Sequence, residues 1–287
     1  MKNVLKKIIK ILLLTIPVIV IIFCICNNIL NKDIKWLKQG HLVAHAFGDY
    51  NGKTYTNSLE AFNLNYEKGH RLFEVDFQFT SDDVLISLHD RNTPIKTFEQ
   101  EQEKVKYTLL TFEDICDLML TYPDIIIITD IKYYFSPEMQ SKVFNYMEKI
   151  IEKKSPSLYK RIIVQVYNQS MYYLLKDNYQ FDSYIYTLYA SSDTDQEVID
   201  FIKKEKIKVV AMWEYRAKQQ DFVKQLKDNN VYIFVHTINN TEIAQELMNG
   251  GVYGIYTDLI TYNDLGYNIT QRYIDFKYNH LKNRIKK

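Results

Sequence analysis

Residues 71–89 read RLFEVDFQFTSDDVLISLH and hold two apolar segments punctuated by acidic side chains and a final histidine. Glu74 and Asp76 stand two residues apart, so in a strand both carboxylates point to one face and the apolar neighbours to the other. Two carboxylates on one buried face repel each other unless a proton or a cation lies between them, which makes a divalent ion the simplest solution. His89 ends the second segment, as His45 ends the similar run HLVAH. The pattern predicts a site that can bind a metal and move protons.

Apolar runs and amphipathic helical patterns alternate along the rest of the chain. Nine runs are predicted strands: residues 41–46, 71–77, 84–89, 125–132, 161–167, 183–189, 208–213, 232–238 and 253–258. Helices are predicted at residues 57–69, 111–120, 137–153, 170–178, 193–205, 218–229 and 241–249, with capping by Asn57, Thr111 and either Asn240 or Thr241. The link between 71–77 and 84–89 is too short for a helical crossover and predicts a hairpin. The other eight strands predict a (β/α)₈ TIM barrel.

The N-terminus begins with four lysines followed by an uncharged run, residues 11–30, long enough to cross a bilayer. We therefore expect a membrane anchor at 1–31, a linker at 32–40, the barrel at 41–265 and a basic helix or tail at 266–287. The positive-inside rule then predicts a single-pass cell-membrane protein with its catalytic domain outside the cytoplasm. A cleaved signal peptide is the alternative, but late in the run stand bulky Phe23, Cys24 and Ile25 rather than a small-residue cleavage site.

The charge balance excludes one broad class of function. Lys and Arg number 36 against 35 Asp and Glu, which argues against a nucleic-acid partner held by phosphate neutralisation. Three cysteines, two of them in the apolar N-terminal run, give no disulfide framework.

Further candidate site residues follow other strands. Asp130 ends the run IIIITD, where a buried carboxylate needs a counter-charge and can supply a third oxygen ligand. Lys132, two residues on, can neutralise it or meet a substrate phosphate. Pocket-lining positions are also expected late in four strands, at Gln165, Tyr186, Trp213 and His236. The histidines His41, His70 and His280 have no evident partner in the sequence.

Six segments together resemble the glycerophosphodiester phosphodiesterase family in order and spacing. They are HLVAHAFG (41–48), TNSLEAF (56–62), GHRLFEVDFQFTSDDVLISLHD (69–90), ITDIK (128–132), VHTINN (235–240) and GGVYGIYTDL (250–259). The resemblance implies a metal-dependent hydrolase on a TIM barrel that cleaves glycerophosphodiesters to glycerol phosphate and an alcohol. It further implies His45 and His89 as the acid and base pair, Glu74, Asp76 and Asp130 as ligands of Ca²⁺ or Mg²⁺, and Lys132 near the phosphate.

The chain departs from the family pattern at four points. Ala46 follows His45 where an arginine is usual, Tyr55 and Thr56 replace a proline and glutamate, Asp130 replaces a glutamate, and His236 occupies a late tryptophan position. Lys53 or Arg91 is a candidate substitute for the missing arginine.

These departures keep other functions open. One is a phospholipase C- or D-like enzyme, or an envelope-polymer phosphodiesterase, with altered phosphate recognition. The other is a non-catalytic binding module on the same barrel, against which the retained histidines and carboxylates argue. The leaving alcohol is not specified by the sequence.

Overall fold

A computed structural model describes residues 34–89, 94–131 and 136–266 of the chain. The predicted anchor, Lys132, Arg91 and nearly all of the predicted C-terminal tail lie outside the described residues. Within the described ranges, no helix combines the length and apolar character that crossing a membrane requires.

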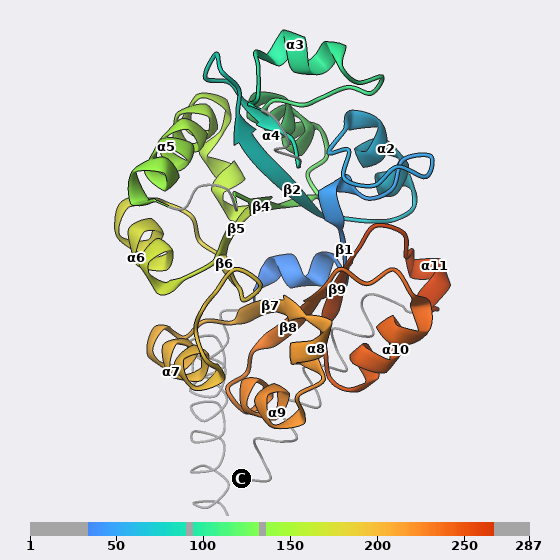
Figure 1. Cartoon of the computed structure of the whole chain (residues 1–287), viewed down its shortest axis with the longest axis vertical. Helices are drawn as coiled ribbons and strands as arrows, with labels where there is room; N and C mark the ends of the chain where they lie inside the picture. Colours follow the sequence, from blue (N-terminus) through green and yellow to red (C-terminus); the bar gives the residue numbers. More distant parts are fainter. Residues whose placement is uncertain (1–33, 90–93, 132–135, 267–287) are drawn as a thin grey trace, which may run out of the picture. The chain divides into compact units, whose positions relative to one another are not determined.

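Eight parallel strands form a closed ring (Figure 1). They are β1 (Leu42–Ala44), β2 (Leu72–Phe79), β4 (Ile126–Asp130), β5 (Ile162–Val166), β6 (Tyr184–Thr187), β7 (Val209–Trp213), β8 (Tyr232–His236) and β9 (Gly254–Thr257). The ring closes because β1 pairs in parallel with both β2 and β9. The ninth strand, β3 (Leu85–Ser87), pairs antiparallel with β2. Both the (β/α)₈ barrel and the hairpin predicted from the short link are confirmed.

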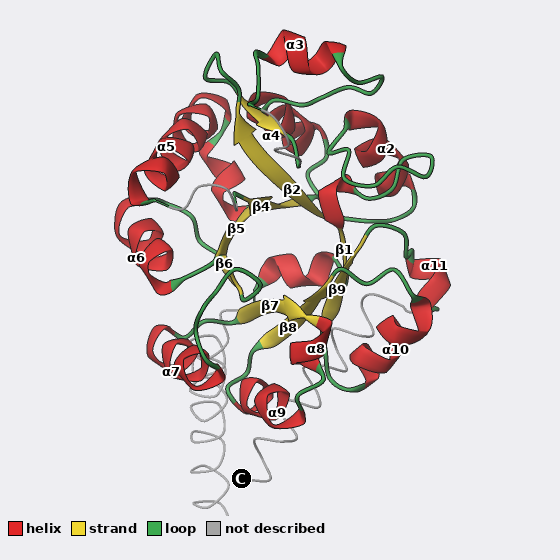
Figure 2. Cartoon of the chain, viewed as in Figure 1, coloured by secondary structure: helices red, strands yellow, loops and turns green. Residues whose placement is uncertain are grey.

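Helices surround the ring, as Figure 2 shows. The predicted ones are present as α2 (Leu59–Glu67), α4 (Phe112–Thr121), α5 (Pro137–Lys154), α6 (Gln169–Asn178), α7 (Asp195–Glu205), α9 (Gln220–Asp228) and α10 (Thr241–Asn249). Short helical segments escaped prediction: α3 (Phe98–Glu103), α8 (Glu214–Ala217), α11 (Tyr262–Leu265), η1 (Lys35–Gln39), η2 (His45–Phe47) and η3 (Pro156–Lys160). Their few residues carry too little of a helical period to be recognised.

Two of the predicted caps are confirmed and one is wrong. Thr111 caps α4 in a capping box, and Asn240 caps α10 by accepting from the backbone N–H of Ile243 at 2.8 Å. At α2 the cap is Ser58 rather than Asn57. The Asn57 side chain instead turns into the barrel, where it contacts Asp76.

The amino end of the barrel is filled by η1, which lies within the predicted linker. Trp36 and Leu37 of η1 are buried, and the Trp36 ring lies 6.1 Å from the Phe234 ring. The hydroxyl of Tyr253, directly before β9, donates to the carbonyl of Leu37 at 2.8 Å. Close packing here also explains Gly254, since a Cβ at this position would come within 2.3 Å of the His41 carbonyl oxygen. Part of the predicted linker is therefore folded into the barrel.

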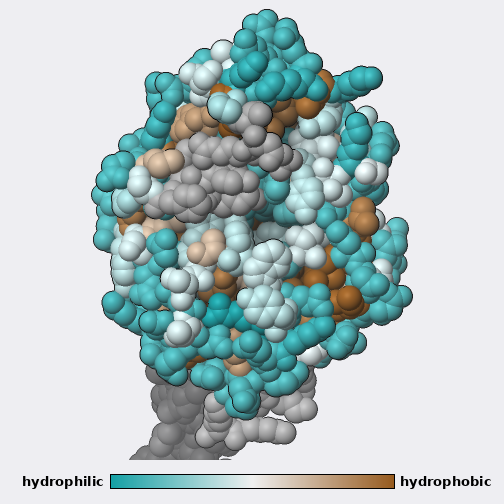
Figure 3. Space-filling model, in the orientation of Figure 1, coloured by the Kyte–Doolittle hydropathy of each residue, from teal (hydrophilic) through white to brown (hydrophobic). Residues whose placement is uncertain are grey.

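The outer helices bury apolar stripes against the strands and present polar faces to solvent. In α10, for example, Ala244, Leu247 and Met248 are buried. The face shown in Figure 3 is accordingly hydrophilic over much of the area that the described helices cover. With its amino end packed, the barrel leaves its carboxyl end for function.

Candidate active site

A cavity of about 360 Å³ opens at the carboxyl ends of the barrel strands. Its walls include seven of the predicted site residues: His45, Glu74, His89, Asp130, Gln165, Trp213 and His236. This is the end of the barrel at which (β/α)₈ enzymes carry out chemistry. Strands that are distant in the sequence thus deliver the predicted side chains to one place.

Three buried carboxylates form the acidic part of the site. Glu74 and Asp76 come from β2 and Asp130 from the last position of β4, where the strand register places it beside Asp76. One carboxylate oxygen from each lies within 4.8 Å of the others, and the three residues are at most 5% exposed. Uncompensated buried charges of one sign are costly. Hard oxygen donors at this spacing fit a divalent cation such as Ca²⁺ or Mg²⁺.

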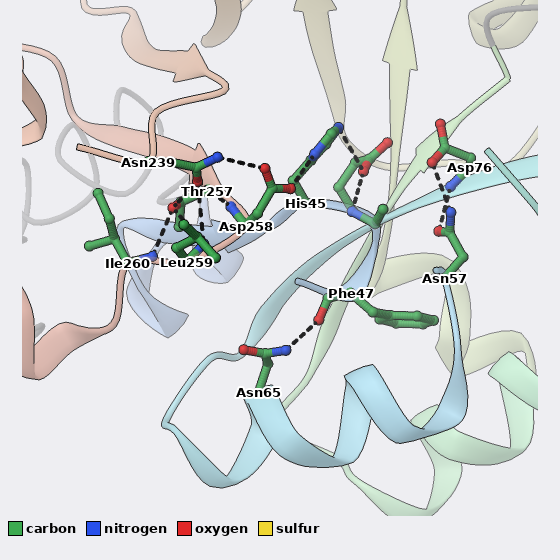
Figure 4. A network of polar contacts seen from close by, with 12 residues as sticks. His45, Phe47, Asn57, Asn65, Asp76, Asn239, Thr257, Asp258, Leu259 and Ile260 are labelled. Carbon is green, nitrogen blue, oxygen red and sulfur yellow. Dashed lines mark hydrogen bonds and ion pairs between the residues drawn. The ribbon is translucent and has the colours of Figure 1, made fainter. Parts of the chain in front are cut away.

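Amide groups hold the two carboxylates of β2. The backbone N–H of Ala46 donates to Glu74 Oε2 at 2.9 Å. The Asn57 side chain donates to Asp76 Oδ2 at 2.9 Å and accepts from the Asp76 backbone N–H at 3.1 Å (Figure 4). Asn57 was expected to cap a helix, and its place in the site was missed.

Two tyrosines hold the third carboxylate. Tyr167, after β5, donates to Asp130 Oδ1 at 2.5 Å, and Tyr189, after β6, donates to Asp130 Oδ2 at 2.9 Å. Burial, and then the charge of Asp130, raise the pKa of both phenols, so both stay protonated and act as donors. Neither tyrosine was singled out in the sequence, which has 24 tyrosines and no pattern that distinguishes these two.

His45 is held by a carboxylate on the opposite side from the acidic cluster. Its Nδ1 lies 2.9 Å from Asp258 Oδ1, and its Nε2 lies 3.9 Å from Glu74 Oε2. Burial alone would lower the pKa of His45, but the charge of Glu74 and the hydrogen bond and charge of Asp258 together raise it to about 9. In the absence of a cation, His45 therefore carries a proton at neutral pH.

Asn239 fixes Asp258 in turn. Its side chain donates to Asp258 Oδ2 at 2.7 Å, while its carbonyl oxygen accepts from the backbone N–H of Asp258 at 2.8 Å and from the Thr257 hydroxyl at 3.0 Å (Figure 4). This chain of contacts orients the imidazole of His45. Asp258 was missed, although it is the last residue of the predicted strand 253–258 and directly follows β9 in the structure.

His89 lies across the cavity mouth from His45, with 6.4 Å between the ring centroids. The Tyr55 ring contacts both histidines, at centroid distances of 5.0 Å from His45 and 4.5 Å from His89. The backbone after β3 is tied down because Gln78 Nε2 donates to the carbonyl oxygens of Leu88 at 2.7 Å and His89 at 3.1 Å. The structure brings the two predicted histidines into one cavity.

The backbone after His45 adopts an unusual conformation. Ala46 and Phe47 have φ values of 49° and 67°, in the left-handed region that side-chain-bearing residues seldom occupy. The turn directs the Ala46 N–H at Glu74, and Asn65 supports it by donating to the carbonyl of Phe47 at 2.9 Å (Figure 4). Asn65 also donates to the carbonyl of Asp49 at 2.9 Å. Strained backbone that surrounding contacts enforce is characteristic of functional sites.

An aromatic wall faces the histidines from the other half of the barrel. We use this name for Tyr189, Trp213 and His236, whose rings lie 4.6–6.1 Å apart and meet at angles of 56–79°. Beside it, Gln165 accepts from the hydroxyls of Thr187 at 2.8 Å and Tyr256 at 3.3 Å. Because both hydroxyls donate to Oε1, the amide nitrogen is the end of Gln165 that can donate into the cavity.

Some expected positions do not contribute to the cavity. Tyr186 is fully buried and its hydroxyl donates to Asp193, so its predicted place in the lining is wrong. Lys53 is exposed in the loop before α2 and does not line the cavity. Lys132 and Arg91 lie outside the described residues.

The fold and the site define a TIM-barrel protein with a candidate oxygen-ligand cation site beside two histidines. The family model described as glycerophosphoryl diester phosphodiesterase matches residues 48–261. The chain therefore belongs to this family and is a phosphoric diester hydrolase.

Solved structures give the same fold at low sequence identity. A Parabacteroides distasonis glycerophosphodiester phosphodiesterase is 18% identical with a TM-score of 0.61, over 83% of this chain and 97% of that chain. An enzyme of the same description from Thermotoga maritima is 18% identical with a TM-score of 0.59, over 76% and 94%. An Oleispira antarctica phosphodiesterase, in complex with the product sn-glycerol-3-phosphate, is 16% identical with a TM-score of 0.60, over 82% and 96%. No curated protein matches the chain.

Proposed function

We propose that the protein hydrolyses glycerophosphodiesters to glycerol phosphate and an alcohol. The observation that carries this proposal is a cluster of three buried carboxylates at the carboxyl end of the barrel, two of which, Glu74 and Asp130, line one cavity together with His45 and His89. Family membership supports the reaction class, and the product bound to the similar Oleispira antarctica protein supports the glycerol phosphate half of the substrate.

The carboxylates of Glu74, Asp76 and Asp130 would hold one divalent cation, either Ca²⁺ or Mg²⁺. Such an ion supplies positive charge that balances the charge growing on the phosphate oxygens. The three carboxylates would serve the reaction by keeping a fixed orientation, because their hydrogen bonds to Ala46, Asn57 and the two tyrosines leave them little rotational freedom.

His45 and His89 would form the general acid and base pair. Hydrolysis needs one group that removes a proton from the attacking hydroxyl and one that protonates the leaving alkoxide. His45 suits such a role because Asp258 fixes its Nδ1 at 2.9 Å, so Nε2 is the nitrogen that exchanges a proton with substrate. His89 is the second member, within 6.4 Å of His45 between ring centroids.

The remaining predicted contacts would bind the substrate. The phosphate would meet Lys132 and the Gln165 amide, while Trp213 and His236 would pack against the alcohol. Ala46 offers only its backbone N–H where an arginine is usual, and this N–H already contacts Glu74. At position 46 the phosphate would therefore lack the side-chain donor that the family pattern supplies.

Residues 1–31 would anchor the protein by a single membrane pass, with the barrel outside the cytoplasm. The four lysines ahead of the uncharged run support this orientation. Protease added to intact cells should digest the barrel, whereas full protection of the barrel would contradict the orientation.

A substrate panel tests the function. The full chain in detergent is offered glycerophosphocholine, glycerophosphoglycerol, lysophospholipid and phosphatidylinositol, each with Ca²⁺, with Mg²⁺ or with chelator. We expect release of glycerol phosphate from a glycerophosphodiester, and only with cation. Cleavage confined to the lipids would favour the phospholipase-like alternative, and saturable binding of a substrate with no cleavage would favour a binding module.

A further inference from the structure

The third carboxylate of the acidic cluster is held differently from the other two. Glu74 receives a backbone N–H and Asp76 a side-chain amide, whereas both oxygens of Asp130 receive phenol hydroxyls. The phenols are Tyr167 and Tyr189, which follow β5 and β6, the next two strands around the ring from β4. Three adjacent strands thus converge on one carboxylate.

The two hydroxyls are themselves constrained. The Tyr167 hydroxyl accepts from the backbone N–H of Ile131 at 2.8 Å, which leaves its proton directed at Asp130. Tyr167 is 6% exposed, and its ring lies 5.8 Å from that of Tyr189. Tyr189 is further held by the other two members of the aromatic wall, with its ring 5.2 Å from His236 and 6.1 Å from Trp213. Moving either phenol away from Asp130 would disturb these contacts.

A ligand carboxylate has rotational freedom that must be lost when a cation binds. A hydrogen bond to each oxygen removes that freedom beforehand, and a carboxylate oxygen that accepts one hydrogen bond has a second lone pair with which it can bind an ion. Asp130 has a short side chain, so its carboxylate reaches the cluster in a narrow range of orientations. The phenol pair selects one of these orientations.

We infer that Tyr167 and Tyr189 are positioning residues that set the affinity of the site for its divalent cation by fixing the Asp130 carboxylate. The inference rests on the proposed cation site, and it assigns to these tyrosines no contact with the reacting atoms. Their hydroxyls act through Asp130. They therefore set the cation concentration at which the site fills, and the site with its cation bound works as in wild type.

Phenylalanine substitutions test the inference, since they remove only the hydroxyl. Calorimetric titration of the full chain with Ca²⁺ and with Mg²⁺ should give dissociation constants roughly 10- to 100-fold higher for Tyr167→Phe and Tyr189→Phe than for wild type. Tyr173→Phe is the matched control. Tyr173 donates to Glu205 at 2.9 Å on the outer helices, and its loss should leave cation affinity unchanged.

Turnover as a function of cation concentration separates positioning from catalysis. In both variants kcat should return to within about twofold of wild type at saturating cation, because the hydroxyls shift only occupancy. A kcat that stays low at saturation would overturn the positioning role. Unchanged dissociation constants in both variants would overturn the whole inference.

Two further measurements keep the outcome interpretable. Thermal melts in chelator establish that each variant is folded, and if Tyr167→Phe does not fold, Tyr189→Phe at the cavity wall decides alone. Glu74→Gln in the same titration tests the cation site itself. If Glu74→Gln binds the cation as tightly as wild type does, or if wild type binds no cation, the proposed site and the inference both fail. If Glu74→Gln binds the cation weakly while both Tyr→Phe variants bind it with wild-type affinity, the inference alone is overturned.

Discussion

The two ends of the barrel each hold histidines close to strand ends, and the surroundings at the two ends shift the histidine pKa in opposite directions. At the carboxyl end, His45 lies between Asp258 and Glu74, and these carboxylates outweigh burial and raise its pKa to about 9. At the amino end, burial dominates at His70, with smaller contributions from the nearby charges of Lys68 and Arg71, and lowers its pKa to about 4. One imidazole is held charged and the other neutral.

This difference shows that the neighbours of a histidine at a strand end set its pKa and its role. His41 and His45 flank the same short strand, yet His41 contacts the carbonyl oxygen of Tyr253 at 3.0 Å and packs on that tyrosine ring, 4.4 Å between centroids. The amino end is a packed layer in which histidines serve structure. The carboxyl end is a cavity in which carboxylates make a histidine fit for proton transfer.

Of the substitutions at the carboxyl end, Glu74→Gln should reduce activity the most. The amide keeps the shape of the side chain but removes one negative ligand, so kcat/KM should fall by a factor on the order of 10³ and cation affinity should fall with it. Stability measured in chelator should change little, because the repulsion relieved within the cluster offsets the lost charge interaction between Glu74 and His45. Steady-state kinetics and thermal melts check this. A fall in melting temperature with normal kcat/KM would reverse the roles that we give to the two ends.

Removal of either histidine at the carboxyl end should have the next largest effect. His45→Asn and His89→Asn should each lower kcat by about 10²- to 10³-fold, since each removes a proton-transfer group. Their circular dichroism spectra should match wild type. His41→Asn at the amino end is the matched control, and we expect its kcat to remain near wild type in folded protein.

The part of the site that could be predicted from the sequence consists of residues that local sequence patterns place on strands. The alternation of strand and helix gave the barrel, and the two-residue spacing of Glu74 and Asp76 gave their common face. Asp130 was found because a carboxylate after four isoleucines demands a partner. These inferences depend on residues close together in the chain, where geometry is fixed by the strand itself.

The supporting contacts could not be predicted because they join distant parts of the chain. Asp258 meets His45 across 213 positions, and Tyr189 meets Asp130 across 59. Asn57 stood at a plausible helix start, so local capping preference pointed to the wrong role. Only closure of the ring brings β9 next to β1 and so places Asp258 beside His45.

Asp258→Asn should have a smaller effect than loss of His45 itself. The variant keeps the side-chain shape but removes a charge-assisted hydrogen bond, so kcat/KM should fall by about 10- to 100-fold. The loss of negative charge also lowers the pKa of His45, so the limb of the pH–rate profile that reports its deprotonation should move to lower pH. Asp124→Asn, whose partner is Arg71 near the amino end, is the control. An unshifted profile in Asp258→Asn would separate Asp258 from the proton-transfer step.

His70→Gln should have the smallest effect on turnover and a clear effect on the pH dependence of stability. The pKa of His70 is lower in the folded chain than its ordinary value of 6.5, so between about pH 6.5 and pH 4 the unfolded state binds a proton that the folded state does not. Through His70, the free energy of unfolding therefore falls by about 1.4 kcal/mol for each pH unit as the pH falls through that window. The glutamine cannot titrate, so urea unfolding of the variant in chelator should show a shallower loss of stability over the same window.

His45→Gln should change the same measurement in the opposite sense. The pKa of His45 is raised, so its stabilising contribution is fully present below about pH 6.5 and is lost as pH rises towards 9. Replacing His45 should therefore lower stability below pH 6.5 and flatten the decline between pH 6.5 and 9, whereas replacing His70 acts only on the acid side. Among the described residues, carboxylates contribute to the pKa shift of His45, whereas none contributes to that of His70. If the two variants showed the same dependence of stability on pH, this contrast between the ends would be contradicted.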